Sequence, residues 1–132
     1  MPFDFSVDHA RRRVNIIASD PLSVDDVLAV LDRQAAQGWT YAVLHDATGT
    51  EWVPSAGEVV RILGYIRTTS RRLGKPRGPV AFVASNEELF GMARMYSRLG
   101  ADDHLLKVQV FTDRAKAENW LDEGQSHDRQ TD

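Results

Sequence analysis

The sequence predicts a single α/β domain with a mixed, mostly parallel β-sheet. The chain has 132 residues, the size of one domain, and an apolar fraction of 42%, which is enough for a compact core. Short apolar runs alternate with amphipathic segments in the order β-β-α-β-α-β-α-β-α. Strands that alternate with helices indicate βαβ crossovers and therefore parallel pairing, with the first strand as the antiparallel member.

The first elements are predicted to be a β-hairpin and an amphipathic helix. Residues 3–7 alternate apolar and polar side chains, as a half-buried edge strand does, and residues 13–18 form a second strand after a turn. Ser23 is a good N-cap, because its hydroxyl can accept a hydrogen bond from a backbone N–H of the first turn. The helix ends at Gly38. Its apolar face consists of Val24, Val27, Leu28, Leu31 and Ala35.

The middle of the chain is predicted to hold a central strand, a long loop and a long helix. The apolar run 41–44 is the strand, which we expect to end at His45 or Asp46. Ser55-Ala-Gly-Glu58 fits a capping box, so the next helix begins there and continues to Leu73. Its buried face consists of Val59, Ile62, Leu63 and Ile66.

The last third of the chain is predicted to add two strands and two helices. A cluster of glycine and proline at 74–79 precedes a central strand at 80–84. Ser85-Asn-Glu-Glu88 predicts a capping box for a third helix, which Gly100 ends. Its inner face consists of Leu89, Ala93, Tyr96 and Leu99. Residues 108–111 form the last strand, and Thr112 or Asp113 caps a short helix that ends at Leu121. The domain therefore spans residues 1–122, and the polar segment 123–132 is predicted to be disordered.

The composition excludes several classes of function. The net charge of −3 argues against a dedicated nucleic-acid binder. The absence of cysteine excludes a disulfide framework, a thiol nucleophile and a thiolate metal site. No apolar run has the length of a membrane span and the first residues do not resemble a signal peptide, so we expect a cytoplasmic protein. Glycine-rich nucleotide motifs and Gly-x-Ser-x-Gly are also absent, so the sequence predicts no cofactor, no metal and no catalytic residue.

The loop between the central strand and the helix at 55 is the candidate binding site. In open α/β sheets, ligands bind at the carboxyl ends of the strands, and the segment 46–54 is the longest strand-to-helix connection. Trp52 is either a rigid binding anchor or a cover for the edge of the core. Ser55 is best explained as a helix cap, with a phosphorylated serine as the alternative. The candidate residues are Asp46, Thr48, Trp52, Val53 and Ser55.

Two further patterns are interpreted as structural. His45 and Asp46 resemble an acid/base pair, but neighbours on a strand point to opposite faces. An enzyme that uses His45, Asp46 or Ser85 would require these side chains to converge in a pocket. The basic residues at the end of the second helix are interpreted as a solvated helix end, with an anion-binding or acidic-lipid surface as the alternative. They are Arg67, Arg71, Arg72, Lys75 and Arg77.

Two segments resemble the SpoIIAA-like family. Gly-Lys-Pro-Arg-Gly-Pro-Val-Ala-Phe-Val-Ala at 74–84 resembles the start of a central strand in these proteins. Val-Phe-Thr-Asp-Arg-Ala-Lys-Ala-Glu-Asn-Trp-Leu at 110–121 resembles their closing element, and the order of elements from Arg13 to Leu121 also fits. The resemblance implies a STAS or SEC14-like fold without catalytic machinery. It also implies that Phe111 lies in the core, that Asp113 caps a helix and that Trp120 and Leu121 dock the last helix.

The resemblance also implies a function. Members of the wider group act as partner-binding regulators, such as antagonists of anti-sigma factors, and others are thought to bind lipids or small apolar ligands. We therefore expect a non-enzymatic module that binds a protein partner through residues 46–57. The alternative is a lipid or other apolar ligand between the sheet and the helices. The exposed first strand would also allow two copies to pair edge to edge.

The resemblance does not extend to the phosphorylation motif. Phosphoregulated members carry Asp-Ser-Ser-Gly at the start of the second long helix. Here the matching stretch is Pro54-Ser55-Ala56-Gly57, in which alanine stands at the phospho-acceptor position. This departure argues against a phosphoswitch, and Ser55 stays only as a shifted alternative to the usual phospho-acceptor.

Overall fold

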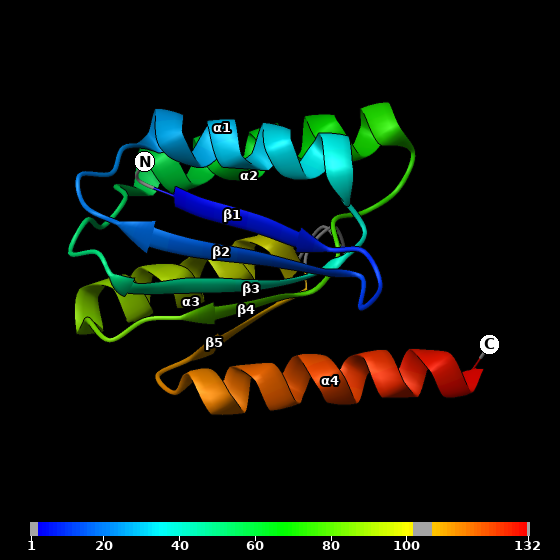
Figure 1. Cartoon of the computed structure of the whole chain (residues 1–132). Helices are drawn as coiled ribbons and strands as arrows, with labels where there is room; N and C mark the ends of the chain where they lie inside the picture. Colours follow the sequence, from blue (N-terminus) through cyan, green and yellow to red (C-terminus); the bar gives the residue numbers. More distant parts are fainter. Residues whose placement is uncertain (1–2, 102–106, 132) are drawn as a thin grey trace.

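A computed structural model describes residues 3–101 and 107–131 of the chain (Figure 1). In this part of the chain the elements are β1 (Phe3–Asp8), β2 (Arg13–Ser19), α1 (Val24–Gln37), β3 (Ala42–Gly49), α2 (Ala56–Leu73), β4 (Val80–Val83), α3 (Glu87–Ala101), β5 (Val108–Phe111) and α4 (Arg114–Thr131). This order confirms the predicted α/β class and the predicted sequence of elements.

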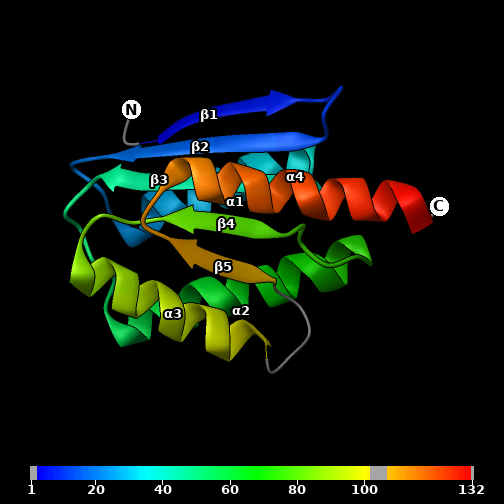
Figure 2. The ribbon, with the colours of Figure 1, turned by 90° about the horizontal axis from the view of Figure 1, so that it is seen from below.

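The sheet follows the order of the chain, β1-β2-β3-β4-β5. The strand β1 pairs antiparallel with β2, and the other three pairs are parallel, as predicted. Because the strand order never reverses, right-handed crossovers put α1, α2 and α3 on one face of the sheet. The helix α4 covers the other face (Figures 1 and 2).

Each face of the sheet has its own apolar core. The larger core lies between the sheet and α1–α3, and it includes Val14, Ile16, Val43, Val59 and Ile66. The smaller core lies under α4 and contains Ala42, Leu44, Ala81, Val83, Ala117 and Leu121, with Phe111 and Trp120 packed against it. Leu121 and Trp120 therefore dock the last helix, as the resemblance implies.

The helix starts follow from local side-chain hydrogen bonds. Ser23 caps α1 as predicted, and it also forms a capping box with Asp26. Ser55 and Glu58 form the predicted capping box at α2. Asp113 caps α4, since its Oδ1 accepts a hydrogen bond of 2.8 Å from the N–H of Ala115. Gly74 ends α2 in the left-handed conformation, with φ at 72°, which glycine adopts without strain.

The predicted bounds are wrong for β3 and α3. The strand β3 continues to Gly49, because β2 still pairs with it there (Ser19 with Gly49), so the loop before α2 is shorter than expected. The cap of α3 is Asn86, whose side chain accepts from the N–H groups of Glu88 at 2.8 Å and Leu89 at 3.3 Å. Ser85 comes too early for this role, since the N–H of Ala84 still bonds to β5.

The ends of α3 and α4 also differ from the expectation. The helix α3 continues past Gly100 to Ala101, and Leu99 is 37% exposed although it was expected on the inner face. The helix α4 continues past Leu121 to Thr131, so residues 123–131 are helical where the composition predicts a disordered tail. The domain boundary at residue 122 stays a prediction.

Candidate functional site

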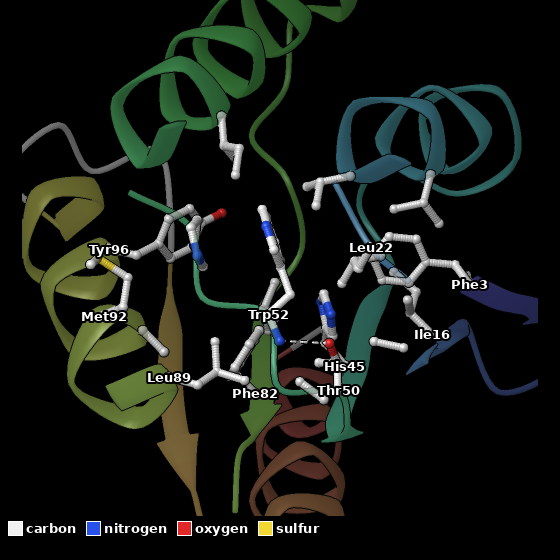
Figure 3. A pocket seen from close by; sticks show the side chains of 18 of the residues that line it. Phe3, Ile16, Leu22, His45, Thr50, Trp52, Phe82, Leu89, Met92 and Tyr96 are labelled. Carbon is white, nitrogen blue, oxygen red and sulfur yellow. Dashed lines mark hydrogen bonds between the residues drawn. The ribbon is translucent and has the colours of Figure 1, made fainter. Parts of the chain in front are cut away.

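A cavity lies between the sheet and α1, α2 and α3 (Figure 3). Its volume is about 90 Å³. About 10–15 Å³ of such space suffices for one water molecule, so this cavity has room for a small organic molecule. Leu89, Met92 and Tyr96 reach it from α3, and Phe3 reaches it from β1. Its wall is mainly apolar, which favours an apolar occupant.

Trp52 is part of the cavity wall. The residue is half-buried and packs against the larger core. Its backbone N–H donates to the hydroxyl oxygen of Thr50 over 3.1 Å. The loop thus places a large aromatic ring against the cavity, and Trp52 covers the edge of the core, which is one of its two predicted roles. Its role as a binding anchor stays a prediction.

Asp20, in the turn between β2 and α1, holds this loop. The Thr50 hydroxyl donates to Oδ1 of Asp20, and the N–H of Glu51 donates to Oδ2 over 3.0 Å. The hydrogen bond from Thr50 is the main reason why the pKa of Asp20 lies below its ordinary value. The two turns at this end of the sheet are therefore joined, and they position Trp52.

His45 brings a titratable group to the cavity. Its ring packs between Phe3, with ring centroids 5.7 Å apart, and Phe82, with centroids 4.7 Å apart. The pKa of His45 is lowered to about 3, mainly by burial and secondly by the positive charge of Arg77, while the charge of Asp46 opposes the shift. The imidazole is therefore neutral at pH 7, with one donor and one acceptor nitrogen.

Arg77 is the cation in the cavity wall, and only 7% of the residue is exposed. Its Nε–H donates to Oε1 of Gln34 over 2.8 Å, and the Tyr96 hydroxyl is hydrogen-bonded to its guanidinium. Burial lowers the pKa of Arg77 and raises the pKa of Tyr96. Arginine stays protonated in proteins, so the site holds a positive charge beside a neutral phenol.

Two of the predicted site residues, Asp46 and Thr48, lie on the other face of the sheet from the cavity. The Oδ1 of Asp46 accepts hydrogen bonds from the Thr48 N–H at 3.0 Å and the Thr48 hydroxyl at 2.6 Å. The Oδ2 accepts one of 3.2 Å from Nη1 of Arg114 on α4. Burial alone would raise the pKa of Asp46, but these contacts outweigh it and lower the pKa. Asp46 therefore helps to dock α4 and does not lie with Trp52.

The other two predicted site residues flank the start of α2. Val53 is half-buried and packs against the larger core. Ser55 is exposed, and its hydroxyl oxygen accepts a 3.1 Å hydrogen bond from the N–H of Glu58, as the cap interpretation requires. The structure thus separates the five predicted residues into the α4 face, the cavity wall, the edge of the larger core and the cap of α2.

The residues considered for catalysis do not converge. His45 borders the cavity, Asp46 faces α4, and Ser85 is exposed beyond the end of β4. Within residues 3–101 and 107–131, no group of three or more histidine, aspartate or glutamate side chains is placed to hold a metal ion. No helix in the same ranges is both long and apolar enough to cross a membrane.

Sequence reasoning missed Arg77, Tyr96 and Gln34 as a buried group. The interpretation of Arg77 as part of a solvated basic helix end is wrong, because Arg77 is buried in the segment that leads into β4. This segment is bonded to the chain at the end of α1, since the N–H of Gly78 donates to the carbonyl of Trp39 over 2.9 Å. The sequence contains one signal for the group. Gln34 follows Val27 and Leu31 at helical spacing, so it is a polar side chain on an apolar face.

Comparisons with known proteins identify the fold. No protein-family model matches the sequence, and no curated protein matches it. Among solved structures, a serine-to-glutamate variant of RsbS from Moorella thermoacetica matches with a TM-score of 0.50 and 15% sequence identity. The match covers 91% of this chain and 97% of that chain. RsbS is a STAS-domain protein, so the comparison confirms the predicted STAS-like fold.

Proposed function

We propose that this chain, which has the STAS fold, is a non-enzymatic regulatory module that binds a protein partner. RsbS, which shares the fold, is a STAS-domain antagonist of an anti-sigma factor. The fold supports a role of this kind, and the scattered positions of His45, Asp46 and Ser85 give no support to catalysis. The binding surface that we propose is the first two turns of α2 with the loop before it.

One observation carries the choice of this surface. Val60 is 58% exposed, more than Ile17 at 39% or Leu99 at 37%, which are the other exposed large apolar residues in the described chain. Ala56 and Gly57 are exposed one turn earlier and lie on the same side of the helix as Val60. Small residues leave the helix backbone accessible, so a partner can approach closely and cover Val60.

Val60→Asp tests the proposed surface. We expect this variant to lose partner binding in a quantitative pull-down while its thermal unfolding stays close to wild type, because the side chain makes little contact within the domain. Thr68→Asp, at an exposed position two turns further along α2, is the matched control and should keep the partner. Equal partner recovery for Val60→Asp and wild type would contradict the proposal. Trp52 is unsuitable for this test, because it lines the cavity.

A second candidate function is the binding of a small apolar ligand. The observation that favours it is the apolar cavity of about 90 Å³ beside Trp52. Ala93 lines this cavity, so Ala93→Leu should fill it and weaken the binding of 1-octanol, measured by tryptophan fluorescence. Ala29→Leu, on the exposed side of α1, is the control and should leave binding unchanged. Failure of wild type to bind 1-octanol, with no adduct in native mass spectra, would exclude this function.

A further inference from the structure

Arg77 is a buried cation that has no negatively charged partner within the described residues. A charge removed from water is normally paired, because burying it alone is strongly unfavourable. Arg77 is 7% exposed, yet no aspartate or glutamate in the described part of the chain forms an ion pair with it. The guanidinium therefore places in the wall of the cavity a positive charge that none of the described carboxylates neutralises.

The groups around Arg77 satisfy hydrogen bonds but supply no negative charge. Gln34 and Tyr96 are neutral hydrogen-bond partners of the guanidinium, and the neutral Trp39 ring lies 5.9 Å from it. His45 is a neutral imidazole at the same cavity. Gln34 is itself held in place, since its amide nitrogen donates to the carbonyls of Gly38 and Trp39, each at 3.3 Å. The position of Arg77 is thus fixed before any ligand binds, and the missing component is an anion.

We propose that the cavity binds a ligand with an apolar body and one carboxylate, and that the carboxylate pairs with Arg77. This inference rests on the proposed ligand-binding function. A planar guanidinium matches the two oxygens of a carboxylate, which makes this pairing strong in an apolar site. The single cation balances one negative charge, which favours a carboxylate over a doubly charged phosphate. The apolar body would lie against residues such as Ile16, Leu22 and Trp52 (Figure 3).

The first test compares octanoate with 1-octanol on the wild-type protein at pH 7.5 by isothermal titration calorimetry. The two probes have the same chain length and differ in the head group. We expect octanoate to bind roughly 10- to 100-fold more tightly than 1-octanol, because the carboxylate would form a hydrogen bond between two charged groups where the alcohol offers only a neutral hydroxyl. Equal binding, or tighter binding of 1-octanol, would overturn the carboxylate assignment and leave the apolar ligand function intact. Binding of neither probe would overturn both.

The second test assigns the preference to Arg77. Arg77→Gln should weaken octanoate binding far more than 1-octanol binding, so that the two probes bind with nearly equal affinity. Arg71→Gln, at an exposed position at the end of α2, is the matched control and should keep the preference. An octanoate preference that persists in Arg77→Gln would overturn the proposal.

A milder variant covers the case in which Arg77→Gln does not fold. Tyr96→Phe keeps the cation and removes only the hydroxyl that is hydrogen-bonded to it. It should lower the affinity for octanoate relative to that for 1-octanol several-fold. An unchanged ratio between the two probes in Tyr96→Phe would contradict a carboxylate at this position.

Discussion

The Nε–H of Arg77 donates a 2.8 Å hydrogen bond to the side-chain oxygen of Gln34, and both residues are buried. The amide nitrogen of Gln34 donates in turn to the carbonyl oxygens of Gly38 and Trp39. A single side chain therefore connects the end of α1 to the segment that leads into β4. Polar groups that are removed from water in this way are costly to leave without a partner.

Gln34→Leu is expected to lower the free energy of unfolding by about 2–4 kcal/mol, because it leaves the buried Nε–H of Arg77 without a hydrogen-bond acceptor. Urea denaturation measures this loss. Gln37→Leu, on the exposed side of the same helix, is the control and should change stability by less than about 0.5 kcal/mol. A similar, small effect for both variants would show that the Gln34 contact does not stabilise the fold.

The elements of the fold were predictable because local patterns determine them. Ser23 and Ser55 begin helices through side chains only three residues away, and such short-range hydrogen bonds are visible in the sequence. The alternation of apolar runs with amphipathic segments also predicted the parallel pairing and the antiparallel first strand, and the structure confirms both. The errors lie at element ends, where pairing with another strand decides the outcome, as it does for Gly49.

The site was only partly predictable, because it depends on contacts between distant segments. Trp52 was identified from its loop, and the structure places it on the cavity. The cavity itself arises from the way α1, α2 and α3 pack on the sheet. Local sequence patterns do not predict this packing. Arg77 looked like part of an exposed basic cluster, since its neighbours Arg71, Arg72 and Lys75 are exposed. Its burial follows from the path of the chain into β4.

Gly78→Ala is expected to destabilise the protein by about 3 kcal/mol or more. A Cβ atom at Gly78 would lie 2.0 Å from the carbonyl oxygen of Tyr41 and 2.6 Å from that of Thr40. Both obstacles are backbone atoms, so a side-chain rotation cannot relieve the clash. Thermal unfolding measures the effect. Gly64→Ala is the control, because a Cβ there meets nothing within 4 Å. It lies within α2 and should stabilise the helix by about 0.5–1 kcal/mol.

Asp46→Asn is expected to lower stability by about 1–2 kcal/mol, because Arg114 on α4 loses its charged partner. Hydrogen exchange should show faster opening of α4. Asp25→Asn removes the exposed ion pair with Arg61 and should have an effect below about 0.5 kcal/mol. The folded pKa of Asp46 is lowered, so this stabilisation is present above the ordinary pKa of 3.8 and is lost as pH falls through the folded pKa. Equal α4 exchange in both variants would contradict this role.

Ser55→Ala is expected to lower the free energy of unfolding by about 1 kcal/mol, because the N–H of Glu58 loses its capping acceptor. Ser55→Asp supplies another acceptor at the N-cap and should be close to wild type. Urea denaturation of the two variants distinguishes a capping role, which aspartate can also fill, from a role that requires the serine hydroxyl itself. Equal loss of stability in both would contradict the cap as the source of the effect.

His45 is expected to make the protein less stable as the pH falls below 6.5. The pKa of His45 is lowered from 6.5 to about 3 in the folded protein, so between these values the unfolded chain binds one more proton. The free energy of unfolding should therefore decrease by up to about 1.4 kcal/mol for each pH unit below 6.5. Urea denaturation between pH 7 and 5 measures this slope above the range in which most carboxylates titrate.

His45→Phe should flatten this dependence, because phenylalanine can pack between Phe3 and Phe82 and carries no titratable group. Parallel profiles for wild type and His45→Phe would show that His45 titrates alike in the folded and unfolded chain. That result would place the imidazole in contact with water, and it would remove His45 from the apolar wall of the cavity.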